Sequence, residues 1–315
     1  MGFRHSLFGW ERSNFTHYQA AYYKYGGSVN THPDIINFFM QKKEKDFAFW
    51  HYRRDGEVTA AYFTSDENTF GLNVWRDYPV SYDEIIIPMA ADQKIVLPVK
   101  TNRLSSSLRG NIINATYAFR EKRKVCLIKT SFSGKTVKKR NGELKKMLAA
   151  GGECIPLREM SPADIADIYV HLFRLRFADS VRCYNRKNIT ELLTALPHIV
   201  TGNVLFFEGV PVAIDLVLYA RSEKSLYFDV PNGGIDPSIT AFSPGSLLMW
   251  KNIVDAREVC RNENKAMQFS IGLYDKNGTI NCFGPKPSRQ VNHWFFELYS
   301  PPCPQQLFIS FRRIQ

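Results

Sequence analysis

The chain has 315 residues, of which 44% are hydrophobic and 23% charged, and this composition is typical of a globular protein with one or two domains. No apolar run approaches the ~18–20 residues that a membrane-spanning helix needs, so the sequence predicts no such helix. Residues 1–15 lack an apolar segment of signal-peptide length, which predicts a cytoplasmic chain. The net charge of +11 favours anionic partners such as nucleic acid, phosphorylated cofactors or an acidic membrane surface.

Cysteine and histidine spacing argues against a metal site. The six cysteines are scattered without a C-x-x-C pair, and the seven histidines form no H-E-x-x-H group. We therefore predict reduced thiols and no bound metal. His32 precedes Pro33 at an expected helix start, so we assign it to the cap region rather than to catalysis.

Two predicted hairpins share one design, in which an aromatic-rich strand turns at an acid–glycine pair into a strand of small and branched residues. They are 47–52 with 58–63 around Asp55-Gly56, and 203–207 with 212–219 around Glu208-Gly209. Their similarity suggests a duplicated architecture. Further strands are predicted over 83–88 and 94–100, each rich in Ile or Val and closed by proline.

The densest basic region lies between residues 120 and 146. It follows a predicted strand, 125–128, and ends at Gly151-Gly152, a pair typical of a helix C-terminus. Either a solvated helix face or contact with an anionic surface explains it. The residues that we assign to membrane or anion contact are Lys138, Lys139, Arg140, Lys145 and Lys146.

A phosphate-loop motif is nearly present in the same region. Ser133-Gly134-Lys135-Thr136 follows a strand, but the motif requires glycine where this chain has Lys129. We therefore reject a nucleotide-hydrolase interpretation.

The stretch 240–276 organises the second half of the chain. Ser243-Pro244-Gly245 is a helix-start signal, because serine can cap the first amides and proline suits the first helical position. The helix is expected to end near Arg261-Asn262, and a strand over 267–271 should come next and break at Gly272. This is either an ordinary helix–strand unit or a platform for an acyl donor.

From residue 129 the predicted order is helix, helix, hairpin, strand, loop, helix, strand. A further helix start at Ser161-Pro162 and a helix over 189–196 belong to this order. The strand 225–230 is expected to end in a turn over 231–234. The order predicts an α/β (α+β) fold with a mixed sheet flanked by helices.

The order and its motifs resemble the GNAT acyltransferase fold, in the branch of the Fem peptidoglycan aminoacyltransferases and cellulose-biosynthesis-type acetyltransferases. The resemblance covers roughly residues 120–285. Its motifs are Lys135-Thr136 with the basic helix, Gly202-x-Val204-Leu205-Phe206, Phe242-Ser243-Pro244-Gly245-x-Leu247-Leu248, and Phe269-Ser270-x-Gly272 with Tyr274 and Lys276. With Tyr25-Gly26-Gly27-Ser28-Val29-x-Thr31-His32-Pro33, the chain is most similar to the macrophage-inducible (Mig) family linked to antimicrobial-peptide resistance. The resemblance implies two GNAT-like units, over 1–118 and 119–315.

The resemblance also implies a donor, acyl-CoA or aminoacyl-tRNA, at the start of the Ser243 helix. Helix-start amides would face its phosphate or thioester oxygen. The cofactor-binding residues are then Ser243, Gly245, Ser246, Leu247 and Ser270. The usual Gln/Arg-x-x-Gly-x-Gly/Ala loop is replaced by Ser243-Pro244-Gly245, and Gln268 stands where this branch often has an acid.

Acyl transfer needs a base and a polarised carbonyl. Asp229 is the candidate base or a turn residue. Lys276 could contact donor phosphate or the oxyanion, or be an exposed turn lysine, and Tyr274 could donate a hydrogen bond or be structural. Asp215 is either a paired buried group or a cleft residue, and Arg174 and Arg176 bind an anionic acceptor or cap a helix.

These expectations lead to three functions. The first is an N- or O-acyltransferase acting on an envelope-related acceptor at the cytoplasmic membrane face, peripherally associated with the inner membrane and contributing to resistance to cationic peptides. The second is a non-catalytic GNAT-fold binding or regulatory protein, which the altered donor loop favours. The third, nucleic-acid binding, has no helix-turn-helix pattern behind it.

Overall fold

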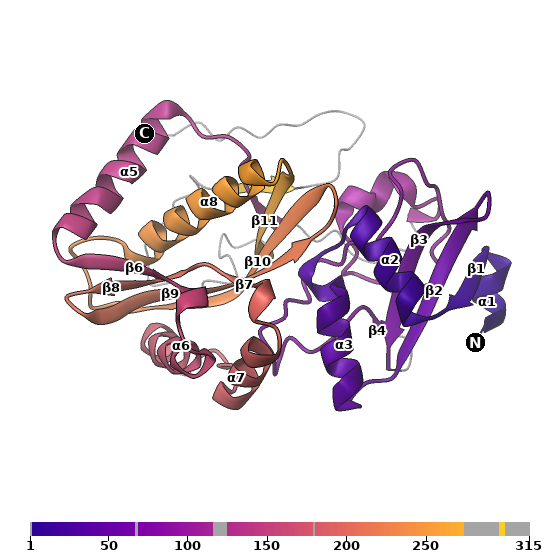
Figure 1. The fold of residues 1–315 in the computed structure, drawn as a ribbon, viewed down its shortest axis with the longest axis horizontal. Coiled ribbons are helices and arrows are strands. Elements are labelled where there is room, and N and C mark those ends of the chain that lie inside the picture. Colours follow the sequence, from indigo (N-terminus) through magenta and orange to yellow (C-terminus); the bar gives the residue numbers. More distant parts are fainter. Residues whose placement is uncertain (1, 67–68, 116–124, 179, 274–295, 300–315) are drawn as a thin grey trace.

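The fold contains two sheets, each with its own helices (Figure 1). The computed structural model describes residues 2–66, 69–115, 125–178, 180–273 and 296–299. One sheet has four strands in the order β1-β2-β3-β4; the other has eight, in the order β12-β5-β11-β10-β9-β8-β6, with β7 beside β9.

The elements up to η2 form what we call the N-terminal unit, and those from β5 onward form the C-terminal unit. The N-terminal elements are α1 (Gly2–Leu7), β1 (Trp10–Ser13), α2 (Phe15–Tyr25), η1 (Val29–Thr31), α3 (Pro33–Lys42), β2 (Phe47–Arg54), β3 (Glu57–Ser65), β4 (Thr69–Phe70) and η2 (Ser106–Asn111). The C-terminal elements are β5 (Val125–Ile128), α5 (Gly134–Ala149), β6 (Gly152–Pro156), η3 (Leu157–Glu159), α6 (Pro162–Phe177), α7 (Arg186–Ala195), η4 (Pro197–Ile199), β7 (Val200–Thr201), β8 (Asn203–Phe207), β9 (Val210–Arg221), β10 (Ser225–Ile235), α8 (Pro244–Asn262), β11 (Ala266–Leu273) and β12 (Phe296–Tyr299).

Helices cover both faces of the C-terminal sheet. In Figure 1, α5 and α8 lie on one side and α6 and α7 on the other. Side chains alternate along the strands accordingly: Val217 of β9 packs with α8, whereas Leu216 packs with α6. The predicted mixed sheet flanked by helices is confirmed.

The two units share one hydrophobic core. Phe39 of α3 and Phe63 of β3 belong to the same buried cluster as Leu192 of α7, Leu218 of β9 and Tyr227 of β10. Since apolar side chains from both units exclude water together, this interface resembles the interior of a domain.

Both predicted hairpins are confirmed, and their turns match in detail. Asp55 and Glu208 have φ angles of 53° and 52°, and the glycines after them, Gly56 and Gly209, have φ angles of 84° and 77°. A two-residue turn with positive φ at both positions matches the twist of the flanking strands. Acid–glycine supplies that geometry, because a short polar side chain tolerates it and glycine favours it.

The predicted helix start at Ser161 and the assignment of His32 to a cap region are confirmed: Ser161 accepts the N–H of Asp164 with its side chain, and Nδ1 of His32 accepts that of Asp34. Ser133 and Asn185, which the sequence analysis did not single out as caps, each accept a backbone N–H in the same way. The prediction for Ser243 was wrong, because its hydroxyl donates to Ser246 Oγ and caps no backbone amide.

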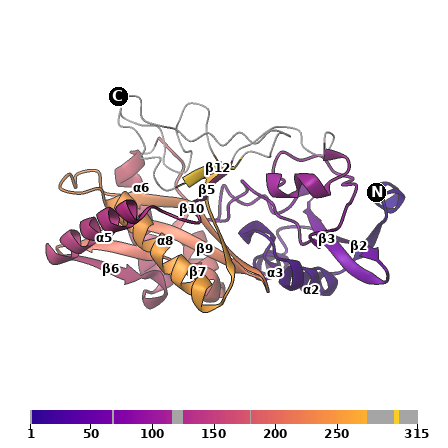
Figure 2. The ribbon, with the colours of Figure 1, turned by 90° about the horizontal axis from the view of Figure 1, so that it is seen from above.

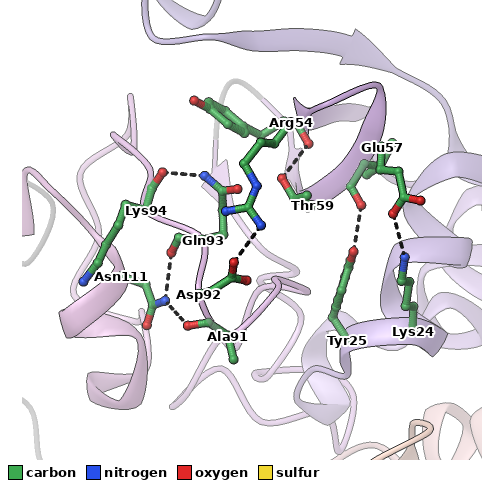
Figure 3. A network of polar contacts seen from close by, with 12 residues as sticks. Lys24, Tyr25, Arg54, Glu57, Thr59, Ala91, Asp92, Gln93, Lys94 and Asn111 are labelled. Atoms are coloured by element: carbon green, nitrogen blue, oxygen red, sulfur yellow. Dashed lines mark hydrogen bonds and ion pairs between the residues drawn. The ribbon is translucent and has the colours of Figure 1, made fainter.

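The strands predicted over 83–88 and 94–100 are wrong. These segments make only isolated bridges, Ile85 with Leu104 and Ile95 with Ile112. Each predicted strand contains a proline, which cannot donate to a ladder. Side chains hold this part of the chain instead (Figure 3): Asn111 Nδ2 donates to the carbonyls of Ala91 and Gln93 at 2.9 and 2.8 Å, and Arg54 binds Asp92 at 2.7 Å.

The turn predicted over 231–234 is also wrong, because β10 continues to Ile235 through a bulge between Asp229 and Asn232. Close packing explains the glycines there. A Cβ at Gly234 would lie 2.6 Å from the backbone of Leu172 and Phe173 in α6, and one at Gly233 would lie 2.3 Å from Asp215 Oδ1. Gly272 likewise lies inside β11, at an irregularity with φ 87°, and does not end the strand.

Candidate functional site

The two parallel strands at the centre of the C-terminal sheet, β10 and β11, separate after Asp229 and Ser270. β10 pairs with β11 from Ser225–Ala266 to Asp229–Ser270, and among the described residues no further pair joins them. Beyond that point β10 follows β9, while Leu273 of β11 pairs with β5. An opening of this kind at the carboxyl ends of parallel strands is where ligands bind in α/β sheets.

Beyond this point no described strand pairs with the edge of β10 that faces away from β9. Asp236 N donates to Val212 O at 2.9 Å, and because such pairs alternate, the main-chain groups of Gly233 and Ile235 point away from β9. Arg176 Nη1 donates to Gly233 O at 3.0 Å, and Asn232 Oδ1 accepts from Gly233 N at 2.9 Å. Arg176 therefore lies at this edge, whereas Arg174 is exposed on α6.

The start of α8 lies at the far end of the same edge. A Cβ on Gly245 would be 3.2 Å from Ile235 Cγ2. Leu247 N donates to Ser243 O at 3.1 Å, so its amide belongs to the helix ladder and Leu247 itself is buried. Gly245 and Ser246 precede it in the first turn, which no side chain caps. Helix-start amides of this kind attract anions.

A buried cluster of acids and tyrosines lies where the parting strands meet the N-terminal unit. Tyr227 Oη donates to Glu84 Oε2 at 2.8 Å, and Ser105 Oγ donates to Glu84 Oε1 at 2.6 Å. Asp229 hydrogen-bonds with Ser270 and Ser81. Glu84, Tyr227 and Asp229 are all less than 10% exposed.

Burial sets the protonation of this cluster. Desolvation, with repulsion from Asp83 and Glu84, raises the pKa of Asp229 well above its ordinary value, although the serine hydroxyls oppose the shift. Burial also raises the pKa of Glu84, against hydrogen bonds from Ser105 and Tyr227. Burial therefore favours the protonated form of both carboxyls, and repulsion from Glu84 adds to the shift at Asp229.

Asp215 lies on the opposite face of the sheet, toward α8. Asn252 Nδ2 donates to Asp215 Oδ2 at 3.2 Å. Burial raises the pKa of Asp215 to about 7, and Arg176 and Asn252 oppose that rise. Of the two alternatives from the sequence, the paired and buried one is correct.

The basic helix α5 presents five lysines on one side. At about 100° per residue, Lys135, Lys138, Lys139, Lys145 and Lys146 fall within an arc of about 120°, and all five are exposed. We call them the lysine face. Arg140 is not part of it, because it is 8% exposed and its Nη1 binds Glu143 at 2.8 Å. The assignment of Arg140 to surface contact therefore does not hold.

The remaining predicted site residues lie elsewhere. Tyr274 and Lys276 are outside the described residues. Ser243 is exposed, and Ser270 is buried beside Asp229.

Two open pockets of about 460 and 450 Å³ lie between α3 and α7 around Lys42 and Glu191, away from the parting strands. Lys42 and Glu191, which line both pockets, neutralise each other at 2.6 Å.

Within the described residues, no three His, Cys, Asp or Glu side chains are placed to hold a metal ion. No helix in that part of the chain is both long and apolar enough to span a bilayer.

Glu84 is the residue of this site that the sequence did not reveal. The available signal was a charged residue in the apolar run Ile85-Ile86-Ile87, which suggests a buried group with a partner. Its partner, Tyr227, lies far away in the chain, so the sequence alone could not pair them.

A mixed sheet with one parting pair of parallel strands, preceded by a second helix–hairpin unit, defines a GNAT-like fold. The solved structure of FemX has a TM-score of 0.50 to this chain at 9% identity, and the match covers 90% of this chain and 91% of FemX. At that identity the likeness concerns the fold.

The sequence identifies the family. The Mig-14 family model matches residues 32–291, and the chain belongs to that family. Two further solved structures are more distant. L-PGS from Bacillus licheniformis has a TM-score of 0.43 at 10% identity, and the match covers 84% of this chain and 79% of that one. A tandem GNAT protein from the clavulanic acid biosynthesis pathway has a TM-score of 0.36 at 11% identity, and the match covers 84% of this chain and 89% of that one. No match was found among curated proteins.

Proposed function

We propose that this protein is an acyltransferase that moves an acyl or aminoacyl group onto an amine or hydroxyl of a cell-envelope-related acceptor. The observation that carries the proposal is the parting of β10 and β11 at Asp229, a buried carboxyl whose pKa is raised by burial and by repulsion from Asp83 and Glu84. The membrane-face location and a contribution to resistance to cationic peptides are part of the same proposal.

The donor would lie along the free edge of β10. From Asp229 to the start of α8 this edge runs for about 20 Å at ~3.3 Å per residue, which suits an extended chain with amide groups. Ile235 would offer main-chain partners along it, and the uncapped amides of Gly245 and Ser246 would hold phosphate at its end. Acyl-CoA fits this arrangement and would supply a thioester as the activated acyl group; aminoacyl-tRNA is the alternative donor.

The acceptor would enter from the side of the N-terminal unit. Tyr227 packs in the core shared with that unit while Phe228 and Val230 pack against α8, so Asp229 faces the same way as Tyr227. The ionised member of the Asp229–Glu84 pair would take the proton that the attacking nitrogen or oxygen loses as it bonds to the acyl carbon. The protonated member would return a proton to the leaving sulfur or oxygen.

Other predicted residues keep supporting roles in this proposal. Ser270 would orient Asp229, and Arg176 would hold the β10 edge in place through Gly233. Arg174 remains a proposed acceptor contact, and Lys276 and Tyr274 remain proposed contacts to the donor and the oxyanion. Asp215 is buried on the other face of the sheet and takes no part in this proposal.

The decisive experiment is calorimetry with acetyl-CoA and longer acyl-CoAs, combined with Ser246→Glu. Glutamate in the first turn favours the helix dipole, so the fold should persist while the added charge repels donor phosphate. We expect binding by the parent protein and at least a tenfold loss in the variant. If neither CoA esters nor aminoacyl-tRNA bind, the protein is a non-catalytic binding or regulatory protein instead.

The chemical step is tested with Asp229→Asn in an acyl-transfer assay. We expect the rate to fall about 100-fold, within the range for a lost acid–base group, with donor affinity unchanged. Asp92→Asn, an exposed partner of Arg54, is the matched control. Equal rates for Asp229→Asn and the parent protein would remove Asp229 from the mechanism.

Membrane association is proposed to act through the lysine face, at about 1 kcal/mol per lysine near an anionic surface. Vesicle flotation on phosphatidylglycerol would compare the fourfold change of Lys138, Lys139, Lys145 and Lys146 to Gln with a control that loses the same charge. The control residues are exposed elsewhere: Lys43, Arg158, Lys187 and Lys224. Equal flotation of the two variants would contradict a specific role for the lysine face.

A further inference from the structure

Glu84 lies at the centre of a chain of hydrogen bonds that reaches the surface. Ser105 Oγ donates to Glu84 Oε1 at 2.6 Å, and the Oγ atoms of Ser105 and Ser107 lie 2.7 Å apart. Because Ser105 gives its one hydroxyl proton to Glu84, the hydroxyl of Ser107 donates to Ser105. Ser105 is buried, whereas Ser107 is exposed on η2. These three side chains thus join solvent to a buried carboxyl.

The same chain continues inward from the other oxygen of Glu84. Tyr227 Oη donates to Glu84 Oε2 at 2.8 Å, and Ser270 hydrogen-bonds with both Tyr227 and Asp229. Ser270 is buried and lies opposite Asp229 in the β10–β11 ladder. Every member of the chain is a hydroxyl or a carboxyl, and each of these groups can give one proton while it takes another.

The chain of hydrogen bonds crosses from one unit to the other. Its outer half belongs to the N-terminal unit and its inner half to β10 and β11, and the two units lie side by side (Figure 2). Main-chain contacts hold the outer half in place: Ser105 N donates to Ile85 O at 2.8 Å, and Ser107 N donates to Ser105 Oγ at 3.2 Å. The carboxyl of Glu84 therefore meets a hydroxyl whose position the fold determines.

The charged and titratable groups around this chain disfavour added negative charge. Burial and then repulsion from Asp83 raise the pKa of Glu84, and burial with Asp83 and Glu84 raises the pKa of Asp229. Asp83 itself lies 3.7 Å from Arg103. Tyr184 also lies near the inner end, where burial, Asp83 and Asp229 raise the pKa of its phenol. A carboxyl that loses its proton to a substrate therefore needs a route by which to regain one.

We propose that these hydroxyls and Glu84 form a proton path between solvent and Asp229, through Ser107, Ser105, Tyr227 and Ser270. Its role rests on the proposed acyl transfer, which adds a proton to one carboxyl and removes one from the other. The hydroxyls act through the two carboxyls and are positioning residues.

The path resets the carboxyls without leaving charge on a hydroxyl. Protonated Asp229 gives its proton to Ser270 as the proton of Ser270 moves to Tyr227 and that of Tyr227 moves to ionised Glu84. At each oxygen one O–H bond forms as another breaks, so Asp229 ends ionised and Glu84 protonated. Glu84 exchanges its proton with water in the same way through Ser105 and Ser107.

The test follows protonation of the two carboxyls in the full chain without any substrate. A pH jump from a photolysed caged proton is followed by time-resolved infrared spectroscopy, and the carboxyl bands are assigned by their loss in Glu84→Gln and Asp229→Asn. Ser105→Ala should slow protonation of both carboxyls about tenfold or more, because it removes the link to solvent. Ser106→Ala, the same change at the neighbouring half-buried serine, is the matched control and should leave both rates unchanged.

Tyr227→Phe keeps the ring and separates the two halves of the path, so it also serves if Ser105→Ala does not fold. It should slow protonation of Asp229 about tenfold while Glu84 keeps the parental rate, a pattern that a general loosening of the fold would not produce. A parental rate at Glu84 in Ser105→Ala, or at Asp229 in Tyr227→Phe, would overturn the proposal.

Ser81 offers a rival route to Asp229, because it also hydrogen-bonds with this carboxyl and is half-buried. Ser81→Ala is therefore measured beside the other variants, and the path predicts a parental rate at Asp229. A rate that falls in Ser81→Ala but in neither Ser105→Ala nor Tyr227→Phe would place the route at Ser81 and contradict the path.

An acyl-transfer assay separates this inference from the proposed function. In Ser105→Ala the turnover number should fall about tenfold, with donor affinity measured by calorimetry unchanged. If the parent protein transfers no acyl group while the infrared rates follow the expected pattern, the proposed function fails and the path is retained. If transfer is observed but Ser105→Ala protonates both carboxyls at the parental rate, the path fails and the proposed function is retained.

Discussion

The two units begin alike and then diverge. Each has two helices followed by a hairpin with an acid–glycine turn: α2, α3, β2 and β3 in one, and α6, α7, β8 and β9 in the other. In the C-terminal unit the next strand, β10, has 11 residues and leads into α8 and the parallel strand β11. In the N-terminal unit the next strand, β4, has two residues.

The two units differ in the chain that comes after this shared part. After β4 the described chain makes isolated bridges and side-chain contacts, and it brings Glu84 to the face of β10. The C-terminal unit therefore contains the parting strands, while the N-terminal unit contributes a carboxyl to the cluster beside them.

The largest expected effect concerns the core that joins the units. Phe39→Ala removes a fully buried ring from the shared cluster and should lower the free energy of unfolding by about 3–5 kcal/mol. Urea unfolding followed by tryptophan fluorescence and by far-UV circular dichroism should give one shared transition before and after the change. Two separate transitions in the parent protein would show that the units fold independently.

The next effect tests the close packing that is special to the C-terminal unit. Gly234→Ala should lower the free energy of unfolding by about 3 kcal/mol, because the new Cβ meets the backbone of α6 and not a movable side chain. Gly142→Ala in α5 is the matched control: its Cβ meets nothing within 4 Å, so alanine should stabilise that helix by about 0.5–1 kcal/mol. The same urea measurement checks both changes, and a neutral Gly234→Ala would refute the contact.

A pH effect tests the buried Asp215 of the C-terminal unit. The pKa of Asp215 is raised to about 7 in the folded state, so between pH 4 and 7 the folded chain holds a proton that the unfolded chain has lost. Asp215 therefore lowers stability by up to about 1.4 kcal/mol per pH unit as the pH rises through this window.

Asp215→Asn should remove this slope. Stability would be measured by urea unfolding at several pH values from 4 to 8. A slope that does not change would mean that Asp215 titrates normally.

The smallest effect tests the likeness of the hairpins. Gly56→Ala and Gly209→Ala both place a Cβ at positive φ with no atom within 4 Å. Each should therefore lower the free energy of unfolding by about 1 kcal/mol through backbone strain alone. Thermal or urea unfolding would compare them. A difference larger than about 1 kcal/mol would mean that the two turns are not equivalent, despite their similar angles.

The features that the sequence could predict were those with local causes. Both hairpins depend on a two-residue turn, and the start of α6 depends on one capping side chain, that of Ser161. The continuation of β10 through Pro231-Asn232-Gly233-Gly234 could not be predicted, because those residues usually form a turn and only the approach of α6 explains them.

The candidate site was predictable only in part. Asp229 and Ser270 were named from their places in the sequence, and they do lie together where β10 and β11 part. Glu84 was missed because its contact with Tyr227 joins segments that are distant in the chain. Arg140 was misplaced because a count of basic residues does not say which side of a helix is buried.

The position of β5 has a consequence for how the chain is made. Leu127 pairs with Ser270 of β11 on one side and with Glu297 of β12 on the other, so both neighbours of β5 are synthesised long after it. Until then its buried residues, such as Cys126 and Ile128, have no strand beside them. Pairing over such a long stretch of chain slows folding and exposes an apolar strand. We expect the newly made chain to need protection by a chaperone until its last strands emerge from the ribosome.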